Sequence, residues 1–258
     1  MVIKLKTSIT IEKIFMKTIN ICIMTHARPE MFRRCIDAIN SNLSTLTTIQ
    51  KTTFNFVVLC DDKSVTERQV KLDSDKLTFI DFEPSEDLSD NYRTLLEESK
   101  TLDPNGYTYF IEDDDYIFID TLHTLFVSAN SGAADNYMYN YKHGFGKDFD
   151  NNHIKNFHFL KFDKYNNTNI PVSEFVKKYD DRNFQLGMVL FSNRSIDFRS
   201  FPKDNILEND YLLFSKLKGT VLISSRKIYQ QGFFNKESKN VSDSNNKESK
   251  FKSLSDYK

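Results

Sequence analysis

Four consecutive carboxylates, Glu112-Asp113-Asp114-Asp115, are the group in this sequence best suited to chemistry. They directly follow the apolar run 107–111, so they stand at the end of a predicted strand. Like charges at this spacing repel one another unless a positive group lies among them. Hard divalent cations such as Mg²⁺ and Mn²⁺ prefer oxygen ligands and commonly bridge to phosphates. The run is either a metal and phosphate site or a solvated acidic turn, and its position after an apolar strand favours the metal site.

Two further polar groups follow apolar runs. Asp61 and Asp62, with Lys63 and Ser64 behind them, come directly after residues 54–60. They could hydrogen-bond a nucleoside or simply begin a turn, since Asp and Ser are common turn residues. In residues 25–29, Arg28 could hold a phosphate, whereas a strand-to-helix cap explains Thr25 and Pro29 without any ligand.

A third candidate lies near the start of a predicted helix in the second half of the chain. Glu208, Asn209 and Asp210 precede the amphipathic run 211–218. An Asp at a helix start is usually an N-cap, which hydrogen-bonds the first backbone amides. The alternative is a carboxylate held at the helix N-terminus as a general base.

The elements that must position these groups alternate between strand and helix. Strands are predicted over residues 18–24, 54–60, 77–82 and 107–111, and helices over residues 30–43 and 90–99. This order is typical of an α/β protein with a mostly parallel central sheet flanked by helices. In such sheets ligands bind beyond the carboxyl ends of the strands. We therefore expect the polar groups at residues 25–28, 61–64, 81–83 and 112–115 to gather on one edge.

The second half of the chain is less regular. A helix is predicted over residues 121–130, a strand over 184–192, a helix over 206–219 and a last strand over 220–230. The segment 136–164 is rich in aromatic and basic residues and predicts irregular strands or a mobile region. We expect an N-terminal extension over residues 1–17 and one domain over 18–234, with halves 18–120 and 121–234. Residues 235–258 repeat NKESK and are typical of a disordered tail.

Composition excludes several classes of protein. The 258 residues carry 35 Lys and Arg against 36 Asp and Glu, a net charge of −1, so overall charge does not drive nucleic-acid binding. Only seven glycines occur, without a phosphate-cradling glycine loop. Three cysteines without a CxxC pair predict a reduced protein in the cytoplasm, and no run approaches the roughly 18 apolar residues of a membrane span.

Taken in order, six segments resemble the inverting family-2 glycosyltransferases of the GT-A fold. INICIMTHARPEMFRRCIDAI resembles the opening strand and helix of that family, and VVLCDDKS its second strand with an acidic pair. DLSDNYRTLLEES resembles a helix that carries an Asn near the diphosphate, and YTYFIEDDDYIF resembles the D-x-D segment. QLGMVLFSNRSI resembles the strand behind the acceptor site, and ENDYLLFSKLKGTVLISSRKIYQ the acidic helix and closing strand.

The resemblance implies a single GT-A domain and a metal-dependent inverting transfer of a hexose from a nucleotide sugar, with UDP-glucose favoured. It implies Mn²⁺ or Mg²⁺ held by Glu112, Asp114 and Asp115, although the acidic pair could be Glu112 with Asp114 or Asp113 with Asp115. Contacts to the nucleotide sugar would come from several side chains: Thr25, Arg28, Asp61, Asp62, Asn91, Arg93 and Asp113.

The resemblance also assigns the base and reveals one departure. Asp210 would accept the proton of the acceptor hydroxyl, with Glu208 beside it. Many relatives end the closing strand with a histidine near the metal, but this sequence has Tyr229-Gln230-Gln231 there.

The acceptor is less defined by the sequence. Aromatic residues in the segment 136–164 could stack on sugars or nucleobases, or form a secondary core. The small size and the composition resemble phage glucosyltransferases that modify hydroxymethylcytosine in DNA, including those that add a second glucose. A transferase of surface polysaccharide is the alternative, and a non-catalytic nucleotide-sugar or DNA-binding module is the alternative from another class.

Overall fold

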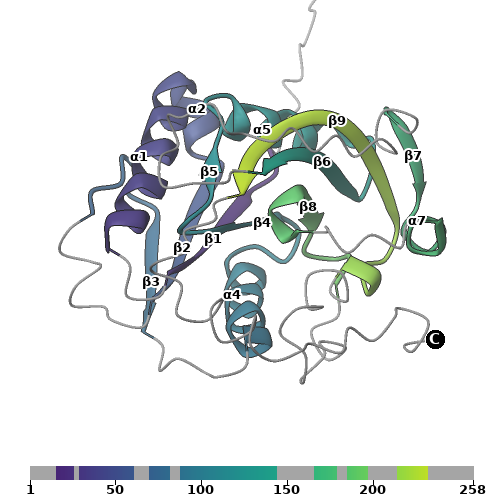
Figure 1. The fold of residues 1–258 in the computed structure, drawn as a ribbon, viewed down its shortest axis with the longest axis horizontal. Coiled ribbons are helices and arrows are strands. Elements are labelled where there is room, and N and C mark those ends of the chain that lie inside the picture. Colours follow the sequence, from purple (N-terminus) through teal and green to yellow (C-terminus); the bar gives the residue numbers. More distant parts are fainter. Residues whose placement is uncertain are drawn as a thin grey trace, which may run out of the picture.

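The computed structural model describes residues 16–25, 29–60, 70–81, 88–143, 166–178, 185–196 and 214–231. Nine strands in this part of the chain form one sheet, in the order β3-β2-β1-β4-β8-β6-β9-β5, with β7 paired to β9 (Figure 1). One half contains β1 (Ile19–Thr25), β2 (Phe54–Cys60), β3 (Leu77–Asp81) and β4 (Tyr107–Glu112). The other contains β5 (Tyr116–Ile117), β6 (Asn136–His143), β7 (Thr168–Pro171), β8 (Val189–Ser192) and β9 (Thr220–Gln231).

Strand direction differs between the two halves. The pairs β1–β2, β2–β3 and β1–β4 are parallel, as the alternation of strands and helices predicts. Strand β8 then runs antiparallel to both β4 and β6, and β9 is parallel to β6 but antiparallel to β5 and β7. The α/β class with a central sheet is confirmed, and the second half mixes strand directions.

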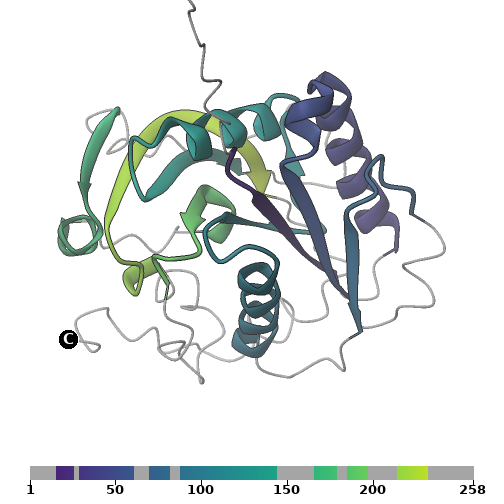
Figure 2. The same cartoon turned by 180° about the vertical axis from the view of Figure 1, so that it is seen from behind.

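Helices cover both faces of the sheet (Figures 1 and 2). Helices α1 (Pro29–Thr45) and α5 (Thr121–Ser131) contact each other on one face. Helix α4 (Leu88–Leu102) lies on the opposite face, against β1 and β2. The short helices α2 (Thr48–Lys51) and α7 (Val172–Lys178), and strands β5 and β7, have no counterpart in the sequence-based prediction. No helix in these described residues is both long enough and apolar enough to cross a membrane.

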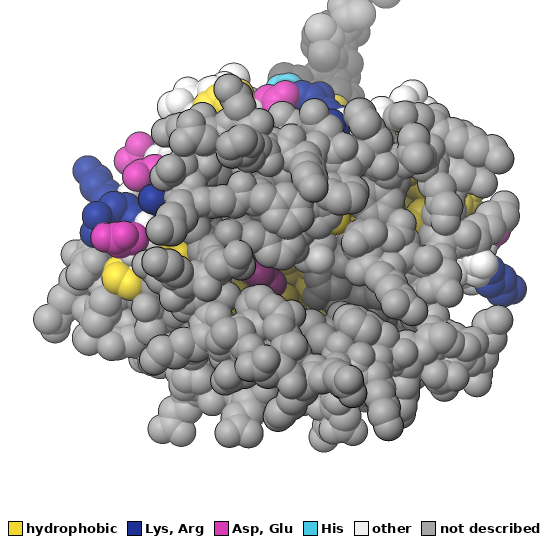
Figure 3. Space-filling view, viewed as in Figure 1, with side chains coloured by type: hydrophobic (Ala, Val, Ile, Leu, Met, Phe, Trp, Pro, Cys, Tyr) yellow, Lys and Arg dark blue, Asp and Glu magenta, His cyan; other side chains and the backbone are white. Residues whose placement is uncertain are grey.

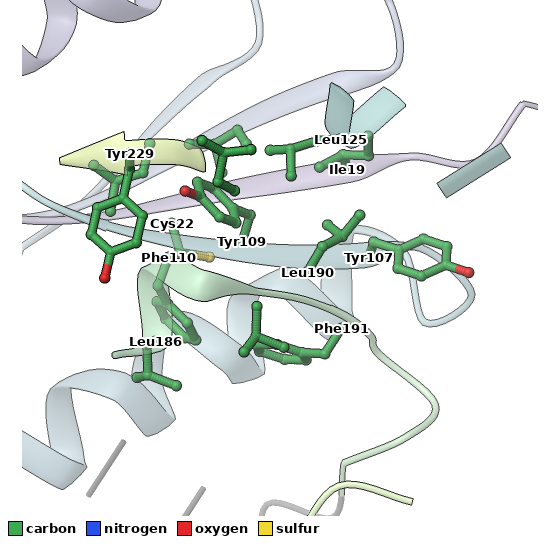
Figure 4. Packing of buried hydrophobic residues seen from close by; sticks show 14 of the residues in the cluster. Ile19, Cys22, Tyr107, Tyr109, Phe110, Leu125, Leu186, Leu190, Phe191 and Tyr229 are labelled. Atoms are coloured by element: carbon green, nitrogen blue, oxygen red, sulfur yellow. The ribbon is translucent and has the colours of Figure 1, made fainter. Parts of the chain in front are cut away.

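The core lies between the sheet and its helices. Both faces of β1 and β4 are buried, so neighbouring side chains point into different layers. Figure 4 shows Tyr109 and Phe110 on opposite sides of β4, with Leu186 beside Phe110. Tyr137, Tyr139 and Tyr141 of β6 are at most 2% exposed. These three tyrosines therefore belong to the core, and they do not form an exposed stacking surface.

A buried polar chain fixes α4 to the amino-terminal ends of the strands. The Asn20 amide donates to the backbone oxygen and the hydroxyl of Ser99, at 2.9 and 2.8 Å. The Asn55 amide donates to the Asn20 side-chain oxygen at 2.7 Å. The Thr108 hydroxyl donates to the side-chain oxygen of Asn193 at 2.5 Å, and the Asn193 amide donates to the Asp103 carbonyl at 2.7 Å. Side-chain and backbone partners therefore replace water for these buried polar groups.

The predicted strand over residues 184–192 is shorter in the structure. A 3₁₀ turn, η1 (Leu186–Met188), precedes β8. The predicted helix over residues 206–219 lies outside the described residues up to residue 213. Phe214 and Ser215 are helical, and Gly219 takes a φ of 85° just before β9. An L-residue other than Gly rarely adopts that φ, so glycine suits this helix-to-strand connection.

Candidate functional site

The carboxyl ends of the parallel strands lie side by side. Thr25 of β1 pairs with Cys60 of β2, which pairs with Asp81 of β3, and Met24 pairs with Glu112 of β4. The register thus brings four strand ends to one edge of the sheet, as the sequence predicts. Thr25 and Glu112 are described there, whereas the polar residues 61–64 that follow β2 lie outside the described residues.

The acidic run forms a tight turn at this edge. Glu112 is the last residue of β4, and the backbone amide of Asp115 donates to the Glu112 carbonyl at 3.0 Å. Asp113 points inward and is only 1% exposed, whereas Glu112, Asp114 and Asp115 are half-buried. The hydroxyl of Thr25 donates to Asp113 Oδ2 at 2.8 Å.

A pocket lies on the α4 side of this turn. Its walls come from β1, β4, α4, the acidic turn and the segment that enters β8: Met24, Tyr92, Phe110, Ile111, Glu112, Asp115, Gln185, Leu186 and Gly187. The Tyr92 hydroxyl donates to Glu112 Oε1 at 2.9 Å, so α4 holds one of the two pocket carboxylates. At the centre of the face in Figure 3, acidic surface lies beside hydrophobic surface at a hollow.

The wall opposite α4 depends on close backbone packing. A Cβ atom at Gly187 would lie 3.2 Å from Cζ of Tyr229, so the glycine lets η1 approach the ring of that tyrosine. The other neighbour of this ring is Tyr141, stacked at 5.2 Å between ring centroids and 12° between planes. Tyr229 pairs with Ile117 of β5, just after the acidic turn. Tyr229, the first of the three residues that stand where the resemblance leads one to expect a histidine, therefore packs in the core and supports the pocket wall.

The first turns of α4 carry two predicted contact residues. Asn91 is 8% exposed, and its side-chain oxygen has no hydrogen-bond partner among the described residues. A buried acceptor without a partner is costly, so a ligand that donates a hydrogen bond here would be favoured. Arg93 forms an ion pair with Asp90 of the same helix. Both side chains are about one-third exposed, 30% and 35%.

The opposite side of the turn is apolar. Burial raises the pKa of the Cys35 thiol well above its ordinary value, and the carboxylates of Asp113, Asp115 and Asp114 raise it further. Cys35 lies in α1 and is 2% exposed. A protonated, buried thiol is a poor nucleophile, so Cys35 has a packing role beneath the turn.

The donor atoms at the pocket suit a hard cation that shares a phosphate ligand. No group of three or more His, Cys, Asp and Glu side chains within the described ranges could hold a metal alone. Two carboxylates, Glu112 and Asp115, line the pocket together. Mg²⁺ is commonly bound by one or two carboxylates plus substrate phosphates and water, so the residues present fit such an ion.

Five predicted site residues lie outside the described residues: Arg28, Asp61, Asp62, Glu208 and Asp210. Seven of the nine lining residues were not predicted as site residues, among them Tyr92, Gln185 and Gly187. One feature of the sequence could have indicated Tyr92: a tyrosine on a buried helix face needs a hydrogen-bond partner for its hydroxyl.

Neither a protein-family model nor a curated protein matches the chain. Solved structures do. TarS 1–349 from S. aureus in complex with UDP-GlcNAc gives a TM-score of 0.60 at 16% identity, over 85% of this chain and 60% of that one. The same fragment in a second structure gives 0.59 at 14% identity, over 83% and 60%. A TarS structure of greater length gives 0.54 at 13% identity, over 84% of this chain and 37% of that one. The matched region thus spans less than two-thirds of the length of these neighbours. At these identities the similarity establishes the fold, which is the GT-A fold of the glycosyltransferases.

Proposed function

We propose that this protein is a glycosyltransferase that moves a hexose from a UDP-sugar to an acceptor hydroxyl with inversion. The main support is the pocket at the carboxyl edge of the parallel strands, where Glu112 and Asp115 face the opening turns of α4. Ligands of open α/β sheets bind at this edge. A second support is that a structural neighbour with the same fold was solved in complex with UDP-GlcNAc.

In this proposal the chain binds the donor through several elements. Two carboxylates of the acidic run, from among Glu112, Asp114 and Asp115, would hold Mn²⁺ or Mg²⁺ together with the donor phosphates. The ion would offset the charge that develops on the leaving diphosphate. Tyr92 holds Glu112 in place through its hydroxyl. The side-chain oxygen of Asn91, which has no partner among the described residues, would accept a hydrogen bond from the UDP-sugar. Contacts to the nucleoside and phosphates are assigned to Arg28, Asp61, Asp62 and Arg93.

The acceptor hydroxyl needs one base for an inverting transfer. Asp210, with Glu208 nearby in sequence, is assigned to take its proton. A carboxylate with an ordinary pKa near 4 is a weak base in water. It suffices when the pocket orients the acceptor oxygen toward the anomeric carbon, because positioning removes much of the entropic barrier.

The reaction is tested by incubating the protein with UDP-glucose or UDP-GlcNAc and Mn²⁺ and measuring released UDP and transferred sugar. We expect Asp114→Asn and Asp210→Asn each to lower transfer by about 100-fold or more. The exposed Asp73→Asn is the matched control and should retain wild-type transfer. Transfer by Asp210→Asn near the wild-type level would remove Asp210 as the base. Wild-type transfer by both Asp114→Asn and Asp210→Asn would refute this site. A wild-type protein that binds the UDP-sugar but neither releases UDP nor transfers sugar would be a non-catalytic module.

For the acceptor we propose glucosylated hydroxymethylcytosine in phage DNA, and surface glycan is the alternative. Support comes from the sequence, in which Lys142, Lys147, Lys155 and Lys161 accompany aromatic residues of the segment 136–164 other than the buried tyrosines of β6. Retention on duplex DNA should fall steeply as salt rises, because phosphate contacts release counterions. Transfer to a polysaccharide acceptor, without salt-dependent retention on DNA, would favour the alternative.

A further inference from the structure

We propose that Thr25 and Asp113 act as a positioning pair that fixes the acidic turn, so that Glu112 and Asp115 face the pocket. This inference rests on the proposed function, because it assigns these two residues to the shape of the donor site instead of to contact with the nucleotide. It also explains why an acidic residue lies in the middle of the run but faces the protein interior.

Burial is the first support. Thr25 is 4% exposed and Asp113 is 1% exposed, although both stand at a sheet edge where a ligand is expected. A buried carboxylate requires hydrogen bonds from the protein, since it has lost those from water. The Thr25 hydroxyl supplies one at 2.8 Å. Hydrogen bonds to ionised groups are about twice as strong as those between neutral groups.

Backbone geometry is the second support. The amide of Asp113 donates to the carbonyl of Met24 at 3.1 Å, one residue before Thr25. The amide of Asp115 donates to the carbonyl of Glu112 at 3.0 Å and closes the turn. The turn is thus bonded to β1 through both the backbone and the side chain of Asp113. Rotation of the turn about the end of β4 would break both bonds.

The division of the four carboxylates is the third support. Side chains alternate across a strand, so Glu112 faces α4, where Tyr92 contacts it, and Asp113 faces the opposite side. On that side, α1 places Cys35 close enough for the charge of Asp113 to raise the pKa of its thiol. Glu112 and Asp115 both line the pocket. The inward anchor of Asp113 therefore determines which carboxylates are left for a ligand.

The test is a double-mutant cycle with a conservative rescue. Thr25→Val removes the hydroxyl at nearly constant volume, Thr25→Ser keeps it, and Asp113→Asn removes the charge at constant shape. Thr124→Val is the matched control, because Thr124 is 7% exposed and its hydroxyl bonds the Asp120 carbonyl within α5. The affinity for UDP with Mn²⁺ is measured by calorimetry, well below the Tm of every variant, and Tm is measured separately.

We expect Thr25→Val to weaken UDP binding about tenfold, and Thr25→Ser and Thr124→Val to stay within about twofold of wild type. Asp113→Asn should add no more than about twofold to Thr25→Val, because both changes disrupt the same contact. If the affinity losses of the two single variants multiply in the double variant, the pair is overturned, because such losses indicate two independent contacts with the nucleotide. Equal losses in Thr25→Ser and Thr25→Val, or wild-type affinity in Thr25→Val, would also overturn it.

Failure of the proposed function gives a different result. If the wild-type protein binds no UDP, the donor assignment fails, and the pair is then judged by Tm alone. The Tm losses of the three variants in the cycle remain non-additive if the bond exists. Additive Tm losses would overturn the pair independently of any ligand.

Discussion

At the scale of single residues, Tyr92 connects helix α4 to the acidic turn through one hydroxyl. Its ring is buried and lies edge-on to Phe110, with centroids 5.3 Å apart. Its oxygen reaches Glu112 at the edge of the pocket. A tyrosine with an apolar body and a bonded polar tip is well suited to hold a carboxylate at the boundary between core and solvent.

Tyr92→Phe should therefore lower sugar transfer with little loss of fold. The change keeps the ring contact and removes the donor to Glu112, which costs about 1–1.5 kcal/mol and thus about tenfold in UDP release. Tyr107→Phe is the control, because Tyr107 is a buried tyrosine at the start of β4, at the other end of that strand from Glu112. Equal activity of Tyr92→Phe and wild type in the UDP-release assay would show that this bond does not matter for the donor site.

The residues of the site differ in how far the sequence could predict them. The placement of the acidic run at the end of β4 and of Asn91 in a helix was predictable, because an apolar run precedes the first and helical spacing surrounds the second. The division of roles within the run was not, because it depends on Thr25, which is 88 positions away in the chain from Asp113. Gln185 likewise enters the pocket only because β8 is adjacent to β4 in the sheet.

At the scale of elements, the turn η1 determines one wall of the pocket. The apolar run before β8 predicts a longer strand, but Gly187 leaves the extended conformation and packs against Tyr229. Periodicity along the sequence cannot reveal this, because the constraint is the ring of a residue on another strand. The buried chain of Asn20, Ser99 and Asn193 was equally hidden, since its members are 79 and 94 positions apart.

Gly187→Ala should narrow the pocket. The added methyl group would meet the Tyr229 ring at 3.2–3.4 Å, so η1 must shift by a few tenths of an ångström, and the space on its other side is the pocket. We expect the KM for the UDP-sugar to rise several-fold, with a stability loss of about 1–3 kcal/mol from overpacking.

Gly132→Ala is the control for that substitution. Gly132 has a φ of 64°, and nothing lies within 4 Å of an added Cβ atom. The change should therefore cost about 1–2 kcal/mol through backbone strain and leave the KM unchanged. A KM that responds equally to both substitutions would indicate a general loss of stability and would contradict a specific role for η1.

At the scale of the whole molecule, buried Cys and Tyr side chains that stay protonated make the stability fall at alkaline pH. Burial, with a smaller effect of Glu98, raises the pKa of the Cys22 thiol well above its ordinary 9.0. Burial also raises the pKa of Tyr107 from 10.0 to about 12, assisted by Tyr137 and Asp135. The pKa of Tyr139 is raised mainly by burial as well. The native state therefore keeps protons that the unfolded chain releases.

The contribution of these groups to the free energy of unfolding should be constant from about pH 7 to about pH 9 and should fall above that range. Each such group lowers the free energy of unfolding by about 1.4 kcal/mol per pH unit between its unfolded and folded pKa values. Urea unfolding from about pH 8 to about pH 11 measures the slope. Tyr107→Phe should make the slope shallower above about pH 10, whereas the exposed Tyr116→Phe should not. A stability that rises over this range would contradict the burial of these groups.

Strand β9 has a consequence for how the molecule is made. It is the last described strand along the chain, and it pairs with β5, β6 and β7, the nearest of which ends about 50 residues earlier. Strands β1 to β4 can pair once residue 112 has been synthesised, but one edge of β6 stays open until residues 220–231 emerge. During synthesis this open edge could pair with another chain. The yield of folded protein should therefore depend on how quickly the ribosome delivers this final strand.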